Sequence, residues 1–185
     1  MSFSQAAGSL AAILGRPADG TAVARVIAGV AAPESGRVFV GEDDVTDLPP
    51  VQRKIAYVPA GGALLPHLTA GENIEYGLRY REHVLGMSSN WQQDLIEQLE
   101  IGSVMGRHPH QLSPARRLRV ALARAMVSMP EVLVIDLPDA GAVGGTLAEL
   151  LTAVQSQDAP GELSTVVVTA DAKLAEHAEP RVELR

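Results

Sequence analysis

Short apolar runs alternate along the chain with longer stretches in which apolar residues recur every three or four positions. The short runs are typical of buried strands, because a strand that is covered on both faces is apolar throughout. The longer stretches predict amphipathic helices, in which the apolar side chains gather on one face. Strands are therefore predicted at 9–14, 37–41, 54–59, 131–136, 164–170 and 181–185.

Capping residues mark where two of the predicted helices begin. Thr69 is followed three residues later by Glu72, which is the spacing of a capping box. Ser113 precedes Pro114, and proline suits the first helical position because the amide hydrogen that it lacks has no helical partner there. The helices are predicted from Gly20 for two to three turns and at 70–82, 91–99, 115–129 and 146–155.

Strands that alternate with helices predict an α/β fold with a mostly parallel sheet and right-handed crossovers. The chain has 185 residues, of which 46% are hydrophobic, so it is long enough for one well-packed domain with a sizeable core. The mean hydropathy of +0.11 argues against a wholly disordered chain.

Charge and cysteine content narrow the range of functions. The formal net charge of −7 argues against nucleic-acid binding through overall charge. The lack of cysteine excludes disulfides and thiolate metal sites, and it suits a reducing compartment. No apolar run approaches the roughly 18–20 residues that cross a bilayer, and no basic lead indicates a secretory signal. We therefore expect a soluble cytoplasmic domain.

Residues 14–30 have the outline of a phosphate-binding loop of the form GxxxxGK(S/T). Such a loop holds phosphates with backbone amides, a lysine and a hydroxyl that ligates Mg²⁺. Gly15 and Gly20 keep the glycine spacing, but Thr21 stands at the lysine position and Ala22 at the hydroxyl position. The positive charge and the metal ligand of such a loop are therefore both missing.

Two more residues of this loop are unfavourable for an anion. Pro17 lacks an amide hydrogen, and Asp19 places a negative charge where phosphates would lie. Each lost charged hydrogen bond costs about 1.5–3 kcal/mol, and about 1.4 kcal/mol is tenfold in affinity, so much weaker binding is predicted. Two interpretations stay open: Thr21 near a helix N-terminus assists a weak anion contact, or the segment is a strand–turn–helix joint.

Three segments together resemble the ATP-binding subunit of an ABC transporter, closest to the sugar-importer type. They are residues 26–58, 63–79 and 108–138, and the similarity covers roughly 9–170 in the family's order and spacing. The resemblance implies a P-loop NTPase-like fold with a mostly parallel sheet flanked by helices. It also implies a single domain at 1–185, with a small helical subdomain at roughly 69–129 inserted into the α/β core.

The family's strand LLLDEP supplies an aspartate for the Mg²⁺ shell and a glutamate that polarises the attacking water. Here Asp136 remains and Leu137 replaces the glutamate, and a leucine neither accepts a proton nor orients water. Asp136 lies at the C-terminal end of the predicted strand at 131–136, where α/β folds place ligands. A residual ligand role and an ordinary strand-end carboxylate both stay open for it.

Three other positions also depart from the family's pattern. The glutamine that senses Mg²⁺ and the permease corresponds to Ala60, and the switch histidine corresponds to Ala170. The aspartate expected after the family's DEP segment corresponds to Val143, with Asp139 as an alternative if the alignment shifts. The resemblance thus implies that the residues that sense the nucleotide are replaced.

The family's signature LSGGQ reaches a partner's γ-phosphate through its serine, its glycine amides and the helix dipole. This chain has LSPAR at 112–116, in which Ser113 survives, Pro114 has no amide hydrogen and Ala115 adds a side chain. Arg116 brings a positive charge that attracts phosphate. Ser113 is also a favourable helix N-cap on its own, so both roles stay open.

The remaining aromatic, histidine and arginine residues are predicted to have structural and not ligand-binding roles. The family begins with an antiparallel sheet that carries an adenine-stacking aromatic residue, and Phe3 is the sole aromatic before the first predicted strand, so no adenine platform is expected. His108 and His110 are interpreted as surface or capping residues rather than metal ligands. A solvated helix face is predicted for Arg116, Arg117, Arg119 and Arg124.

We predict a degenerate, non-catalytic subunit that docks to a permease or to a partner ATPase. The alternatives are a weak ATP-binding or ATPase subunit that completes its site with a partner, and a diverged domain with an unrelated ligand. No catalytic residue and no metal site are predicted. The remnant nucleotide-binding residues are Gly15, Gly20, Thr21, Ser113 and Asp136.

The resemblance also implies the partners. Residues 66–82 and the helix near Trp91 correspond to the region that receives a permease's coupling helix. An ABC permease or another ABC ATP-binding subunit is the expected partner, without nucleic acid. No cofactor is expected, and ATP with Mg²⁺ would bind only to a residual site. The expected location is the cytoplasm, with attachment to the inner face of the cell membrane only through a partner.

Overall fold

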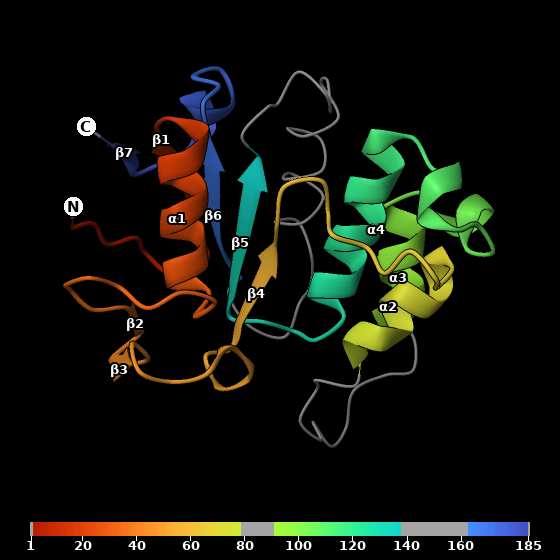
Figure 1. Ribbon diagram of the computed structural model, residues 1–185, viewed down its shortest axis with the longest axis horizontal. Helices are drawn as coiled ribbons and strands as arrows, with labels where there is room; N and C mark the ends of the chain where they lie inside the picture. The colour runs from red at the N-terminus through yellow and green to blue at the C-terminus, as the bar shows by residue number, and fades with distance from the viewer. Residues whose placement is uncertain (1, 79–90, 138–162, 185) are drawn as a thin grey trace. The chain divides into compact units, whose positions relative to one another are not determined.

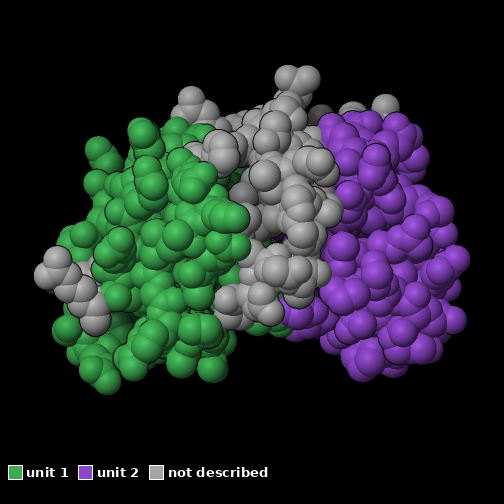
Figure 2. All heavy atoms as spheres, turned by 90° about the horizontal axis from the view of Figure 1, so that it is seen from above, with its two compact units in different colours: residues 1–60, 130–141, 158–185 green, residues 61–129, 142–157 purple. Residues whose placement is uncertain are grey.

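The chain divides into two compact units, which Figure 2 shows in different colours. The computed structural model describes residues 2–78, 91–137 and 163–184. Unit 1 comprises residues 1–60, 130–141 and 158–185, and unit 2 comprises residues 61–129 and 142–157. Unit 1 holds the main sheet, and the regular elements described in unit 2 are helices and turns.

Unit 1 is built on a five-stranded sheet in which every neighbouring pair of strands is parallel (Figure 1). The predicted α/β fold with a mostly parallel sheet is therefore confirmed. The strands agree with the predicted ranges to within two residues at each end. In spatial order they are β4 (Ile55–Val58), β5 (Val132–Leu137), β6 (Ser164–Thr169), β1 (Leu10–Leu14) and β7 (Arg181–Glu183).

Apolar side chains on both faces of the sheet form the core of unit 1. On one face lies α1 (Pro17–Ile27), which contributes Ala24 to the core (Figure 1). On the other face, η5 (Leu174–His177) brings Ala175 against Ala12. Central strands covered on both sides are expected to be apolar throughout, as β5 and β6 nearly are. The cluster under α1 consists of Ile13, Ala24, Val134, Val166 and Val168.

Helix α1 begins at Pro17, three residues before the predicted start at Gly20. The prediction was wrong because it took the start from the glycine and not from the proline, whose fixed φ and missing amide hydrogen suit the first helical position. At its other end α1 stops at Ile27, and Gly29, with a φ of +75°, follows in the left-handed conformation that commonly ends helices. Val30, predicted to belong to the helix, is 49% exposed.

A buried arginine holds the C-terminal end of α1. Arg53 is 3% exposed, and its guanidinium donates to Val26 O at 2.9 Å and to Ile27 O at 3.1 Å. The same group donates to Leu48 O at 2.8 Å and to Thr46 O at 2.6 Å. Because the last carbonyls of a helix have no helical partner, Arg53 satisfies them and joins α1 to the segment that leads into β4.

The predicted strand at 37–41 is shorter in the structure. β2 (Phe39–Val40) pairs antiparallel with β3 (Asp43–Asp44), and each strand has two residues. Beyond this short ladder, Thr46 Oγ1 accepts a hydrogen bond from Val38 N at 2.8 Å, so a side chain replaces a strand partner. The 3₁₀ turn η1 (Pro50–Gln52) then leads to β4.

Unit 2 is helical in its described part, and its α2 and α4 pack closely against each other. A Cβ atom at Gly77 of α2 would collide with Arg124 O of α4, so this crossing requires glycine. Close packing of this kind leaves little room for larger side chains. The elements are α2 (Ala70–Leu78), α3 (Trp91–Gln98), η2 (Gly102–Val104), η3 (Pro109–Gln111) and α4 (Pro114–Met126).

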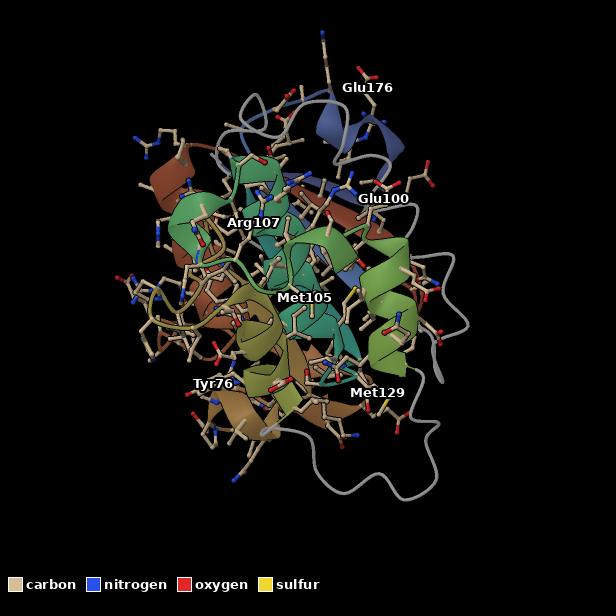
Figure 3. All side chains as sticks on the ribbon, turned by 90° about the vertical axis from the view of Figure 1, so that its right-hand side faces the viewer. Tyr76, Glu100, Met105, Arg107, Met129 and Glu176 are labelled. Carbon is tan, nitrogen blue, oxygen red and sulfur yellow. The ribbon has the colours of Figure 1, made fainter. Side chains whose placement is uncertain are left out.

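The predicted capping box at the start of α2 is confirmed. Thr69 N donates to Glu72 Oε2 at 2.7 Å, and Glu72 N donates to Thr69 Oγ1 at 3.3 Å. Two further amides of this helix end are satisfied by the segment that carries Met105 and Arg107, both labelled in Figure 3. Ala70 N donates to Arg107 O at 2.8 Å, and Gly71 N donates to Met105 O at 2.9 Å.

The arginines of α4 do not form the predicted solvated face, because three of the four fold back onto carbonyl oxygens of unit 2. Carbonyls at the ends of helices and turns lack helical partners, and a guanidinium supplies several donors at once. Arg116 is exposed, as predicted. The bonds run from Arg117 to Leu112 O (3.1 Å), from Arg119 to Leu99 O (3.0 Å), and from Arg124 to Gly62 O (2.8 Å) and Ala63 O (2.9 Å).

Several predictions fall on residues that the structure does not describe. They are the helix at 146–155, residues 79–82 of the helix at 70–82, and the positions Asp139 and Val143. Among the described helices, none is both long enough and apolar enough to cross a membrane.

Candidate nucleotide site

Three side chains meet at the carboxyl end of β5, where α/β sheets commonly place their ligands. Asp136 is 1% exposed, and its Oδ2 accepts a hydrogen bond from Thr21 Oγ1 at 2.8 Å and from Tyr57 OH at 3.2 Å. The three residues come from β5, α1 and β4. The structure thus brings together two of the predicted site residues, Thr21 and Asp136, and adds Tyr57, which the sequence analysis missed.

The register of β4 and β5 explains why Tyr57 reaches the aspartate. Tyr57 pairs with Val134, which lies two residues before Asp136. Side chains two residues apart on a strand point to the same face, so Tyr57 and Asp136 both face α1. The contact joins residues 79 positions apart in the chain, and no local sequence pattern marks it.

The second carboxylate oxygen of Asp136 is left without a partner. Asp136 Oδ1 is buried and accepts no hydrogen bond from the residues that the structure describes. A buried polar atom without a partner costs about 1–3 kcal/mol, so such atoms are rare in folded proteins. A water molecule, an ion or a ligand atom at this oxygen would remove that cost.

The residues that precede Thr21 are wound into the first turn of α1. Gly20 N donates to Arg16 O at 3.0 Å, which is the helical bond between residues four apart. Thr21 and Ala22 follow inside the helix, so their amides point to carbonyls of the preceding turn. The amides at the second glycine of the predicted loop are therefore used within the helix itself.

Few groups at the N-terminus of α1 suit an anion. Pro17 has no amide hydrogen, so Ala18 and Asp19 carry the first-turn amides that lack a helical acceptor. Asp19 Oδ2 pairs with Arg16 Nε at 2.6 Å, and the Arg16 side chain is 85% exposed. An exposed pair of this kind contributes little to stability. The Asp19 carboxylate, in the first turn of α1, complements the helix dipole, and its negative charge disfavours a second anion there.

Both glycines of the predicted loop are required by packing. A Cβ atom at Gly20 would lie 2.6 Å from Val168 Cγ1, and one at Gly15 would lie 2.8 Å from Leu184 Cβ. Carbon atoms in a well-packed interior do not approach so closely. The glycine spacing is therefore explained by the fit of the turn and of α1 against neighbouring strands, with or without a phosphate.

Among the described positions of unit 1, those that correspond to the family's glutamate, glutamine and histidine carry apolar side chains. Leu137 is buried at 5% exposure, and Ala60 and Ala170 are exposed residues after their strands. Ser113 belongs to unit 2, where its side chain accepts a hydrogen bond from Arg116 N at 3.3 Å and caps α4. The capping role considered for Ser113 is thus present in the structure.

Phe3, His108 and His110 take part in packing, helix capping and ring stacking. Phe3 is partly buried and packs against the cluster of side chains under α1. His108 is the N-cap residue of η3, and its ring stacks on the exposed His110 with 5.8 Å between the ring centroids. Within 2–78, 91–137 and 163–184, no three or more acidic or histidine residues form a group that would hold a metal ion.

Burial, the charge of Asp136 and the hydrogen bond to it raise the pKa of Tyr57 from 10.0 to about 12. The pKa of Tyr57 is higher in the folded than in the unfolded state, so the protonated Tyr57 hydroxyl stabilises the fold. This contribution to the free energy of unfolding is complete below pH 10 and is lost as the pH rises toward 12. We expect the free energy of unfolding, measured with urea from pH 10 to pH 12, to fall less steeply for Tyr57→Phe than for the wild type. Equal slopes would contradict this assignment.

Comparison with known proteins places these observations in a family. The profile of the ABC transporter family matches residues 1–140. The molybdate/tungstate import ATP-binding protein WtpC of Thermococcus kodakarensis is 39% identical over 139 residues, which cover 75% of this chain and 42% of that protein. The Fe(3+) ions import ATP-binding protein FbpC of Pseudomonas fluorescens is 36% identical over 180 residues, or 92% of this chain and 49% of that protein. The chain spans less than half the length of these relatives.

Solved structures agree with the sequence comparison. The ATP-binding cassette MJ0796, solved as a dimer in a post-hydrolysis state with ADP and Pi, has a TM-score of 0.79 and 25% identity, and the match covers 99% of this chain and 84% of that one. A nucleotide-free ATP-binding cassette from an ABC transporter has a TM-score of 0.78, with 98% of this chain and 79% of that chain covered. Its 20% identity supports the fold alone.

Proposed function

The chain belongs to the ABC transporter family, and we propose that it acts as a non-catalytic member that works through contacts with other proteins. The observation that carries the proposal is the helical first turn of α1, in which Gly20 N is bonded to Arg16 O. A phosphate loop works by leaving such amides free to converge on a ligand. Here the corresponding backbone is committed to the helix.

Mg-ATP is the ligand that the family implies, and we infer that the residues do not fit it. Thr21 and Ala22 supply neither a positive charge nor a Mg²⁺-ligating hydroxyl, since the Thr21 hydroxyl is bonded to Asp136. Mg²⁺ takes six oxygen ligands in near-octahedral geometry, usually from carboxylates, waters and phosphates. Leu137 cannot accept a proton from an attacking water. No hydrolytic step is therefore assigned to this chain.

One observation favours a second candidate function, weak nucleotide binding completed by a partner subunit. Asp136 Oδ1 is buried without a hydrogen-bond partner in the described part of the chain, and a cation or a water held by a cation would satisfy it. Against this candidate stands the lack of any positive side chain at the Thr21 position. We therefore rank it second.

The proposed contact surface includes the segment that leads into α2, which the resemblance relates to permease docking. Asn73 fixes this segment, because its Nδ2 donates to Leu65 O and Leu68 O, both at 3.2 Å, and its Oδ1 accepts from Leu65 N at 2.8 Å. A rigid surface of this kind binds with a smaller ordering cost than a flexible one. An ABC permease or another ABC ATP-binding subunit is the proposed partner, through which the chain would reach a membrane. The predicted likeness to sugar importers stays a prediction.

Phosphate release from Mg-ATP tests the catalytic part of the proposal. The matched control is Asp136→Asn, which keeps the shape of the side chain and removes the charge that any residual metal chemistry would need. We expect the wild type and the control to give the same rate, equal to the background of the preparation. A wild-type rate at least tenfold above that of Asp136→Asn would contradict the proposal.

Retention by a tagged permease tests the docking part. The chain is co-expressed with each ABC-type permease of the same genome and purified through the permease, with and without Mg-ATP. We expect one permease to retain the chain equally in both conditions. Retention only with Mg-ATP would support the second candidate, and retention by none would contradict docking to a permease.

A further inference from the structure

We propose that the hydrogen bonds from Thr21 and Tyr57 to Asp136 form a permanent internal tether, which replaces a bound ligand in holding the start of α1 on the sheet. This Asp136 tether comprises the three residues and their two bonds at 2.8 and 3.2 Å. The inference goes beyond the loss of catalysis, because it assigns these side chains a new task in the ligand-free fold.

The two hydroxyls converge on one charged atom from two different elements. Asp136 Oδ2 accepts from Thr21 on α1 and from Tyr57 on β4, so the carboxylate at the end of β5 joins a helix and a neighbouring strand. Asp136 is 1% exposed, so water does not screen its charge. Hydrogen bonds to an ionised group are roughly twice as strong as those between neutral groups.

The Asp136 tether lies directly after residues 15–20, the segment predicted to be a phosphate-binding loop. Thr21 directly follows Gly20, whose amide closes the first turn of α1 onto Arg16 O. Gly20 also lies against Val168 of β6, where even a Cβ atom would not fit. The first turn of α1 is thus fixed at two adjacent residues. Ordering a backbone segment costs about 1–2 kcal/mol per residue, and these contacts offset that cost in place of a ligand.

Isosteric removal of the hydroxyls tests the Asp136 tether by urea unfolding of the full chain. We expect Thr21→Val and Tyr57→Phe each to lower the folding equilibrium constant by roughly tenfold or more, because each removes a hydrogen bond to a buried charge. The double variant should lower it by more than the product of the two effects, since the carboxylate then has no donor. The matched control is Thr165→Val, because Thr165 is fully buried on β6 and its Oγ1 has no partner among the described residues. This control should not lower the constant.

Amide hydrogen exchange supplies a local readout that a general loss of stability would not reproduce. We expect Thr21→Val to lose protection at the Gly20 amide by roughly tenfold more than at the Ala24 amide, one turn further along α1. Thr21→Ser keeps the hydroxyl and should keep the protection at Gly20. Thr165→Val should leave both amides unchanged.

Two results would overturn the Asp136 tether: an unchanged folding constant in Thr21→Val and Tyr57→Phe, or equal exchange at Gly20 in Thr21→Val and the wild type. Failure of the proposed function has a different signature. Phosphate release from Mg-ATP together with the expected effect of Thr21→Val would overturn the non-catalytic function and leave the tether standing. If Thr21→Val has the folding constant and the Gly20 exchange of the wild type, and the chain does not bind Mg-ATP, the tether is overturned and the proposed function stands.

Discussion

Replacement of Arg53 by methionine is expected to lower the free energy of unfolding by about 3–5 kcal/mol. The guanidinium donates to four carbonyl oxygens, of Val26, Ile27, Thr46 and Leu48, and it is 3% exposed. Val26 O keeps a hydrogen bond from Gly29 N, but the carbonyls of Ile27, Thr46 and Leu48 lose this donor. Each acceptor left without a donor away from water costs about 1–3 kcal/mol, and local relaxation recovers part of the sum. Methionine has a similar unbranched stem, so lost packing contributes little to the difference.

Urea unfolding followed by circular dichroism measures this loss. The matched control is Arg37→Met in the same unit, because Arg37 is 71% exposed and pairs with Asp44 at 3.5 Å. An exposed ion pair contributes at most about 1 kcal/mol, so the control should change little. Arg53→Lys should fall between the two, since one ammonium group does not reach all four carbonyls. Equal stability of Arg53→Met and Arg37→Met would contradict the role given to Arg53.

Asn73→Asp is expected to lower the free energy of unfolding by about 3 kcal/mol. The Asn73 side chain is fully buried on α2, and its Nδ2 donates to the carbonyls of Leu65, Leu68 and Thr69. A carboxylate of the same size would turn an acceptor toward these three oxygens. Leu65 N would still donate to one carboxylate oxygen, but the other would face carbonyl oxygens without a donor. Burying such an ionised group costs several kcal/mol unless it takes up a proton, so the loss should exceed that of a neutral substitution.

Gln93→Glu on the exposed face of α3 is the matched control for Asn73→Asp, because it makes the same amide-to-acid change. Gln93 donates to Glu97 Oε1 at 2.9 Å, and a like-charge pair four residues apart on a helix costs only about 0.2–0.5 kcal/mol. Thermal unfolding at neutral pH compares the two. A loss in Asn73→Asp no larger than in Gln93→Glu would contradict the buried network around Asn73.

The sequence was sufficient for those features that depend on local patterns. Apolar runs located the strands of the parallel sheet, and the Thr69–Glu72 spacing located a capping box that the structure contains. Ser113 before Pro114 located the start of α4, because a serine N-cap followed by proline at the first helical position is also a local signal. The start of α1 at Pro17 differs from the predicted start at Gly20 although proline carries the same signal, because the glycine spacing of a phosphate loop favours a turn up to Gly20.

Other features were beyond sequence reasoning because they depend on distant segments. Tyr57 reaches Asp136 only through the pairing of β4 with β5. The arginines of α4 were predicted to form a solvated face, yet three of the four donate to carbonyl oxygens of distant or neighbouring segments. No local pattern singles out Arg53, whose four acceptors lie on two segments that only the fold brings together. The packing of Gly15 and Gly20 against Leu184 and Val168 likewise needs the folded chain. That packing offers a reason for the glycine spacing that the motif alone does not.

Calorimetric titration of Mg-ATP into the full chain tests the central claim most directly. Because the amide of Gly20 is bonded within α1 and Thr21 is bonded to Asp136, we expect no saturable heat at millimolar nucleotide. Asp136→Asn should give the same trace as the wild type. Saturable binding in the micromolar range that Asp136→Asn abolishes would contradict the claim that this member of the family has no working nucleotide site.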